Sequence, residues 1–161
     1  ADNNYKRFLK DYVPEKMATV GTGDIMDESG KIVGTHDGYP NYTIGQRKGL
    51  GLSNPEPRYV TQIEPSLNQI VIGKKEALFE NTCYMSQVNW LISPTGFPFE
   101  VEAQIRYNST VVAAEIKQNN SKYEITFNNP QSAVTPGQSI VFYHDDMVLG
   151  GGIIERAHTD A

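Results

Sequence analysis

The chain has 161 residues, of which 39% are hydrophobic and 20% charged, an ordinary composition for a soluble globular protein of one domain or two small ones. Its formal net charge of −5 argues against a protein that coats nucleic acid with its whole surface, although a local patch can still bind phosphate. There is no apolar run long enough to cross a bilayer and no cationic-then-apolar leader, so we expect neither a membrane span nor a secretory signal.

The first half of the chain predicts one short helix followed by β-hairpins. Apolar residues recur at helical spacing within residues 5–13, so a short helix should end before Pro14. The stretch DIMDESGKIVG has β-prone flanks around a polar turn, and RYVTQIEPSLNQIVIG repeats that pattern. The polar residues 74–76 then mark a candidate boundary between a central domain, 1–78, and a C-terminal domain, 79–161.

The second half predicts a succession of short strands. Strand signals recur at FEVEAQIRY, TVVAAEIKQ, KYEITF, QSIVFY and MVLGGGII, and the first and third of these alternate apolar and polar residues as half-buried strands do. Evenly spaced turns between short strands indicate a small barrel or sandwich. The fold class is therefore mainly β. Residues 81–161 hold 4 Lys and Arg against 8 Asp and Glu, and residues 1–80 hold 10 against 11, so any electropositive surface should lie on the first half.

The stretch YTIGQRKGLGL, residues 42–52, places a glutamine and two cations between glycines. Glycine tolerates positive φ and close backbone approach, so these glycines should shape a loop. A turn by itself does not need Gln46, Arg47 and Lys48. The stretch is either an exposed charged hairpin or a surface that binds something negative.

The search for catalytic residues and metal ligands gives no complete motif. Neither a GxxxxGK[ST] phosphate loop nor a GxSxG elbow occurs. His36 and the His-Asp-Asp run at 144–146 stand in turn-like sequence, which we favour over metal ligands because turns recruit aspartate. Cys83 lies in an apolar segment without a neighbouring cation and should be a buried structural thiol; a single cysteine excludes an internal disulfide and fits a reducing cytoplasm. A strand bend where another backbone comes close explains LGGGII more simply than a phosphate site.

Two long blocks, residues 23–52 and 59–73, closely resemble the middle region of the bacterial tRNA-specific 2-thiouridylase (MnmA) family. The pieces AQIRY, AVTPGQSIVFY and VLGGGII resemble that family's C-terminal barrel, in the same order, so the resemblance extends from about residue 8 to residue 155. It implies a small β-rich central domain followed by a six-stranded β-barrel similar to the second domain of translation elongation factors.

The resemblance also implies a cytoplasmic enzyme that replaces the C2 oxygen of the wobble uridine of certain tRNAs with sulfur. In that family an N-terminal domain uses ATP and magnesium to adenylate the uridine, and catalytic cysteines handle persulfide sulfur from a carrier protein. This chain shows no SGGVDS-like nucleotide motif, and Cys83 matches neither catalytic cysteine. We therefore expect the central and C-terminal domains alone, with no catalytic residue, metal or cofactor of their own and no activity in isolation.

The family's tRNA contacts carry over to three positions. The Arg-Tyr pair of the RY strand is Arg106 and Tyr107 here, and the glutamine of TPGQS is Gln138. Arginine offers a planar fork for phosphate, tyrosine a stacking face, and glutamine both a donor and an acceptor. If these residues do not contact tRNA, Arg106 is simply an exposed cation on a strand and Gln138 a residue of a turn. Residues 46–48 would face the RNA or the adjoining catalytic domain.

Two other classes of protein fit parts of the sequence. A stand-alone β-barrel binding module related to translation factors would explain TPGQSIVFY without any enzyme, but it explains YTIGQRKGLGL poorly. A carbohydrate-active or ligand-binding all-β domain is suggested by nine tyrosines and the acidic charge balance.

Overall fold

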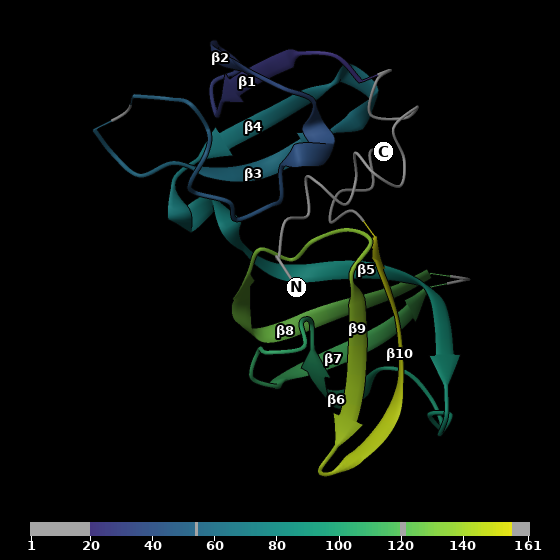
Figure 1. Ribbon diagram of the computed structural model, residues 1–161. Helices are drawn as coiled ribbons and strands as arrows, with labels where there is room; N and C mark the ends of the chain where they lie inside the picture. The colour runs from purple at the N-terminus through teal and green to yellow at the C-terminus, as the bar shows by residue number, and fades with distance from the viewer. Residues whose placement is uncertain (1–19, 54, 120–121, 156–161) are drawn as a thin grey trace, which may run out of the picture. The chain divides into compact units, whose positions relative to one another are not determined.

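The computed structural model describes residues 20–53, 55–119 and 122–155, and it divides the chain between Leu78 and Phe79 into two compact units, called unit 1 and unit 2 below. Strands dominate both units (Figure 1). The helix predicted for residues 5–13 lies outside the described residues. Within the described ranges, no helix is long and apolar enough to cross a membrane.

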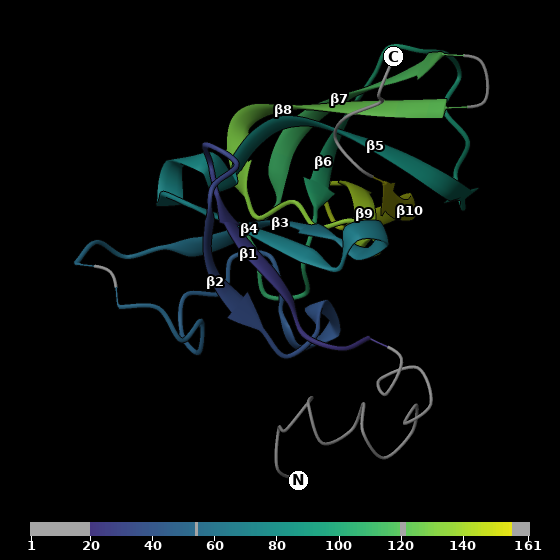
Figure 2. The same ribbon diagram turned by 90° about the horizontal axis from the view of Figure 1, so that it is seen from above.

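Unit 1 is built on a four-stranded sheet with the order β2-β1-β4-β3 (Figure 2). Its strands are β1 (Gly23–Asp27), β2 (Ile32–His36), β3 (Tyr59–Glu64) and β4 (Gln69–Gly73). Both predicted hairpins form, since β1 pairs antiparallel with β2 and β3 with β4. The two hairpins join through parallel pairing of β1 with β4, which the sequence patterns did not predict. Three short 3-10 helices connect these strands to their surroundings: Tyr39–Asn41, Pro65–Leu67 and Lys75–Leu78.

The first hairpin turn shows why a polar sequence closes it. Asp27 Oδ1 accepts hydrogen bonds from the Ser29 amide (2.9 Å), the Ser29 hydroxyl (2.6 Å) and the Lys31 amide (3.0 Å). These bonds satisfy backbone donors that a tight turn leaves unpaired. Strand residues and the long β2–β3 connection both contribute to the core beneath the sheet, which contains Ile25, Val60, Ile70, Ile72, Tyr42 and Leu50.

Unit 2 is a closed antiparallel barrel of six strands in the order β10-β5-β8-β7-β6-β9, which confirms the mainly-β fold and the six-stranded barrel. The strands are β5 (Phe79–Trp90), β6 (Phe99–Gln104), β7 (Val112–Asn119), β8 (Lys122–Ser132), β9 (Ser139–His144) and β10 (Met147–Glu155). Alternate residues of each strand point inward, and the resulting core includes the fully buried Phe142, Met85, Ile116, Ile125 and Ile140.

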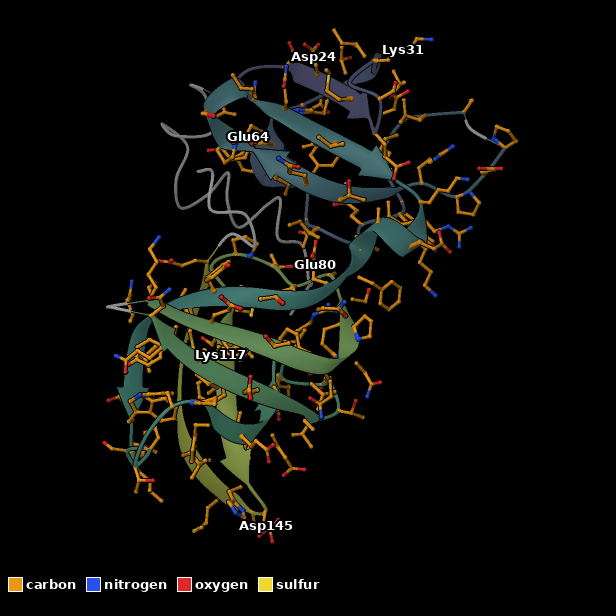
Figure 3. All side chains as sticks on the ribbon, turned by 180° about the vertical axis from the view of Figure 1, so that it is seen from behind. Asp24, Lys31, Glu64, Glu80, Lys117 and Asp145 are labelled. Atoms are coloured by element: carbon orange, nitrogen blue, oxygen red, sulfur yellow. The ribbon has the colours of Figure 1, made fainter. Side chains whose placement is uncertain are left out.

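Because each strand of the barrel runs antiparallel to its neighbours, the connections gather at two ends. The turn between β6 and β7 and the loop between β8 and β9 lie at what we call the first end. The loop between β5 and β6 and the hairpin turn between β9 and β10 lie at the second end, where the Leu91 amide donates to the Leu149 carbonyl. Figure 3 labels Glu80 near the first end and Asp145 at the second.

The glycine run in β10 allows the barrel to close. A Cβ atom on Gly150 would collide with the Asn89 carbonyl of β5, and one on Gly151 would collide with the Ile140 carbonyl of β9. The pairing register of β10 shifts between Val148 and Gly150 against β9, and between Gly151 and Ile153 against β5. These irregularities bend the strand. The prediction of a bend with close backbone approach is confirmed.

Gly151→Ala should therefore destabilise unit 2 by about 1–3 kcal/mol, because the added methyl group must push β9 away. Urea unfolding followed by circular dichroism measures the change. Gly96→Ala is the matched control, since a Cβ atom there meets nothing within 4 Å. It should be neutral or slightly stabilising. Equal stability of the two variants would contradict this account of the glycine run.

Candidate functional site

The turn between β6 and β7 presents the predicted Arg106 and Tyr107 at the first end of the barrel. Buried Ile105 fixes the base of the turn in the core, while the Tyr107 side chain is 95% exposed. The Ser109 amide and hydroxyl both donate to the Arg106 carbonyl, at 3.0 and 2.9 Å. Gln104 Nε2 donates to the Ser109 carbonyl at 2.7 Å. The turn is thus held by its own polar groups, and the tyrosine ring stands free on it.

Arg106 ties this turn to the loop between β8 and β9. Its Nη2 donates to the carbonyl oxygens of Ser132 and Ala133, the second at 2.9 Å. The Thr135 hydroxyl donates to the same Ala133 oxygen at 2.9 Å. Arginine carries five N–H donors in a rigid fork, so one nitrogen can anchor the loop while others face solvent. Arg106 is therefore both an exposed cation and a structural tie.

Gln138 lies in the loop that Arg106 holds. The Gln138 amide donates to the Thr135 carbonyl at 3.2 Å, and its carbonyl accepts from the Ile154 amide of β10 at 2.8 Å. The backbone therefore has its partners, but the side-chain Oε1 is buried without a hydrogen-bond partner. Buried acceptors in native proteins are usually paired with a protein group or an ordered water. The structure brings all three predicted residues of the barrel to one end.

The glycine-rich loop of unit 1 is shaped as the sequence predicted, but Gln46 serves the loop itself. Gly45, Gly49 and Gly51 adopt φ values of 86°, 76° and 67°, which favour glycine. Gln46 Oε1 accepts from the Thr43 amide and its Nε2 donates to the Lys48 carbonyl, both at 3.0 Å. The side chain is thus bonded at both ends within its own loop.

Of Gln46, Arg47 and Lys48, the two cations are exposed to solvent, whereas Gln46 is partly buried. The loop beneath them is pinned to β3, because the Gly45 amide donates to the Val60 carbonyl at 2.8 Å and the Val60 amide donates to the Gln46 carbonyl at 2.9 Å. Two cations on an anchored loop form a small basic surface. Of the three residues predicted here, these two are available to an anionic partner.

The histidines considered as ligands lie in different settings. His36 is 2% exposed, accepts a hydrogen bond on Nδ1 from the Gly38 amide at 3.0 Å, and meets the Tyr42 ring edge-on at 5.3 Å. Burial lowers its pKa, which keeps the ring neutral. His144 lies on the exposed hairpin of the second end, 3.2 Å from Asp145. Among the described residues, no group of three or more His, Cys, Asp or Glu is placed to hold a metal ion.

Cys83 is fully buried in the barrel, as its apolar surroundings in the sequence predicted. Burial raises the pKa of its thiol to about 12. Because the thiolate is the nucleophilic form, this cysteine is chemically silent at neutral pH. It acts as a small apolar residue of the core.

Comparison with known proteins identifies the family. The model of the tRNA methyl transferase PRC-barrel domain matches residues 6–74, and that of the aminomethyltransferase beta-barrel domain matches residues 80–154. The tRNA-specific 2-thiouridylase MnmA of Chlorobium phaeobacteroides is 44% identical over 158 residues, covering 97% of this chain and 44% of that protein. The chain belongs to the MnmA family. It contains the family's central and C-terminal domains.

Other MnmA relatives agree. The protein of Carboxydothermus hydrogenoformans is 43% identical over 157 residues, 96% of this chain and 42% of its own length, and that of Trichormus variabilis is 42% identical over 162 residues, 97% and 44%. The chain thus spans less than half the length of these curated relatives. The similarity runs through both units, whereas a stand-alone barrel module accounts for unit 2 alone and a carbohydrate-binding domain for neither.

Sequence reasoning missed the residues that hold the first end of the barrel together. Gln104 Oε1 accepts a hydrogen bond from the Tyr143 hydroxyl at 3.2 Å, and Gln104 Nε2 donates one to the Ser109 carbonyl of the β6–β7 turn. Thr135 shares the Ala133 carbonyl with Arg106. A threonine directly before Pro-Gly is a usual turn residue and could have been noticed. The long-range partner of Gln104 leaves no local signal in the sequence.

Cys83 should resist alkylation in the native protein. A pKa raised from 9.0 to about 12 lowers the thiolate fraction at pH 7.5 about a thousandfold. Iodoacetamide should leave the native chain unmodified for about an hour and should label it completely in about 8 M urea. Mass spectrometry measures the labelled fraction. Fast labelling of a chain that remains folded would refute the buried-thiol assignment.

Unit 1 should lose stability as the pH falls below the ordinary histidine pKa of 6.5, because the folded pKa of His36 is lowered. The unfolded chain then binds a proton that the folded chain does not, so the stability is fully present above pH 6.5 and declines below it. Urea unfolding between about pH 7.5 and 5.5 measures this slope. His36→Gln should flatten it, and the exposed control His144→Gln should not. The same slope in all three proteins would contradict the prediction.

Proposed function

We propose that this chain is the tRNA-binding and positioning part of a cytoplasmic tRNA-specific 2-thiouridylase, an enzyme that puts sulfur on C2 of the wobble uridine using ATP and a persulfide. The observation that carries the proposal is the gathering of Tyr107, Arg106 and Gln138 at the first end of the barrel. The names of the MnmA relatives support a tRNA substrate.

Each of the three side chains suits one part of a nucleotide. The Tyr107 ring is exposed on a turn already fastened by hydrogen bonds, so a base stacks on it without first ordering the turn. The solvent-facing N–H groups of Arg106 suit a phosphate oxygen. The half-buried Gln138 side chain carries both a donor and an acceptor, which suits a ribose hydroxyl or the edge of a base.

The proposal assigns positioning to this chain and the chemistry to the part of the MnmA proteins that it does not match. ATP, magnesium and the sulfur-carrier protein would act there. The buried Cys83 supports this division, since its thiol is protonated at neutral pH. The exposed Arg47 and Lys48 would contact either the tRNA or that catalytic part.

The test measures tRNA affinity at several salt concentrations. Few well-placed cations predict weak binding, with a shallow slope of about two to four in log K against log salt. Arg106→Ala should lower that slope by about one, since a phosphate partner is lost. Tyr107→Ala should weaken binding by about 1–3 kcal/mol through lost stacking while leaving the slope unchanged.

Matched variants separate these effects from general damage. Tyr107→Phe keeps the ring and should bind nearly as wild type, and Arg106→Lys should retain the salt slope because it keeps the charge. Lys122→Ala removes an exposed cation from the second end and should leave tRNA affinity unchanged. If Arg106→Ala and Tyr107→Ala both bind like wild type at every salt concentration, the proposed surface is wrong.

A further inference from the structure

Four large apolar side chains are exposed together at the second end of the barrel. They are Leu91 (67% exposed), Ile92 (49%), Met147 (55%) and Val148 (41%), and we call them the apolar rim. The amides of Leu91 and Ile92 both donate to the Leu149 carbonyl, at 2.9 and 3.1 Å, so the end of β5 lies against the start of β10. Clustered exposed apolar residues mark contact surfaces more often than single ones do.

The rim begins directly after a packed cluster of aromatic rings. Trp90, directly before Leu91, stacks on the buried Phe142 with ring centroids 5.5 Å apart. The same indole meets Phe97, Phe99 and Tyr123 at 6.3 to 6.4 Å. A surface backed by packed aromatic rings keeps its shape and needs little ordering when a partner binds.

An acidic groove on the outer face of the barrel leads to the same hairpin. It encloses about 510 Å³, and its charged lining residues are Glu100, Glu102, Glu115 and Asp145, with His144 beside them. Figure 3 shows Asp145 at the tip of the β9–β10 hairpin. Asp146 and then Met147 follow it in the chain, so the lining of the groove ends two residues before the apolar rim.

The groove carries a like-charge pair that the fold does not need. Glu100 of β6 lies directly opposite Glu115 of β7 in the strand register. Like charges in that position destabilise a sheet. Lys117 relieves one of them through an ion pair with Glu115 at 3.0 Å, and no ion pair involving Glu100 is found among the described residues. The negative charge that remains at this position is suited to a cationic partner.

We propose that the apolar rim and the acidic groove together form a docking site for a basic segment of another protein, with apolar side chains on the rim and lysines or arginines along the groove. Charge decides between the possible occupants. The carboxylates repel the phosphates of RNA. Two copies of this chain would meet acid to acid, and each copy carries a net charge of −5. A cationic, apolar segment is complementary in both respects.

The probe is a fluorescent twelve-residue peptide made of leucine and lysine. Two control peptides replace its lysines by glutamates or its leucines by serines. The leucine–lysine peptide should bind the 161-residue chain one to one, with NMR shift changes confined to the rim and the groove. The double variant Leu91→Ser, Met147→Ser should weaken this binding at least about tenfold. Leu67→Ser, which alters a 64% exposed leucine of unit 1, should leave it unchanged.

The charge requirement is tested separately. Asp145→Asn together with Asp146→Asn should weaken binding severalfold and flatten its salt dependence, whereas Glu80→Gln near the other end of the barrel should do neither. The proposal is overturned if the glutamate peptide binds equally well, or if the rim variants bind the lysine peptide like wild type. Competition by oligouridylate at the same residues would make this an RNA surface. A wild-type dimer that the rim variants dissociate would make it a self-association surface.

Discussion

The closure of the barrel depends on the near absence of side chains along Gly150–Gly152. Strand β10 must approach β5 on one side and β9 on the other, and carbonyl oxygens of both neighbours occupy the space that Cβ atoms would fill. The strands alternate in direction around the closed barrel, and this alternation decides which connections share an end. Arg106 and Gln138 are 32 positions apart in the sequence, yet they lie at the same end of the barrel because β6 and β9 are antiparallel neighbours.

The two ends of the barrel have opposite chemical character. The first end offers an exposed aromatic ring and an anchored guanidinium, which suit a nucleotide. The second end offers exposed aliphatic side chains beside carboxylates, which repel phosphate. The carboxylates of the second end would therefore repel RNA, while the guanidinium and the aromatic ring of the first end would attract it. On the proposed tRNA-binding function, this arrangement would let a protein with a net charge of −5 bind an anionic partner at one local surface.

The sequence predicted the secondary-structure elements far better than it predicted which strands pair and which side chains form hydrogen bonds. Local patterns were enough for both hairpins of unit 1 and for β6 to β10 of the barrel, although β6 ends at Gln104, before Arg106 and Tyr107, and β5 was not predicted as a strand. Alternation and turn residues report which face is buried and where the chain reverses. The parallel pairing of β1 with β4 has no such signal, since it depends on Gly23 letting the backbone near Asn68 come close. Side-chain partners were equally hidden. Nothing in GQRKG indicates that Gln46 bonds its own loop while Arg47 and Lys48 stay exposed.

The role of Arg106 shows how structure changes the meaning of a predicted site residue. As an isolated cation it would contribute only a charge, and a mobile side chain loses conformational entropy when it binds. Here the bonds to the Ser132 and Ala133 carbonyls hold the guanidinium and both loops before any ligand arrives. Tyr107, the next residue, is consequently presented on a fixed turn, and its stacking face needs no ordering. In the proposed complex, the contact between the guanidinium and a phosphate and the stacking contact would thus depend on the same hydrogen bonds, so Arg106 would act on a nucleotide partly through Tyr107.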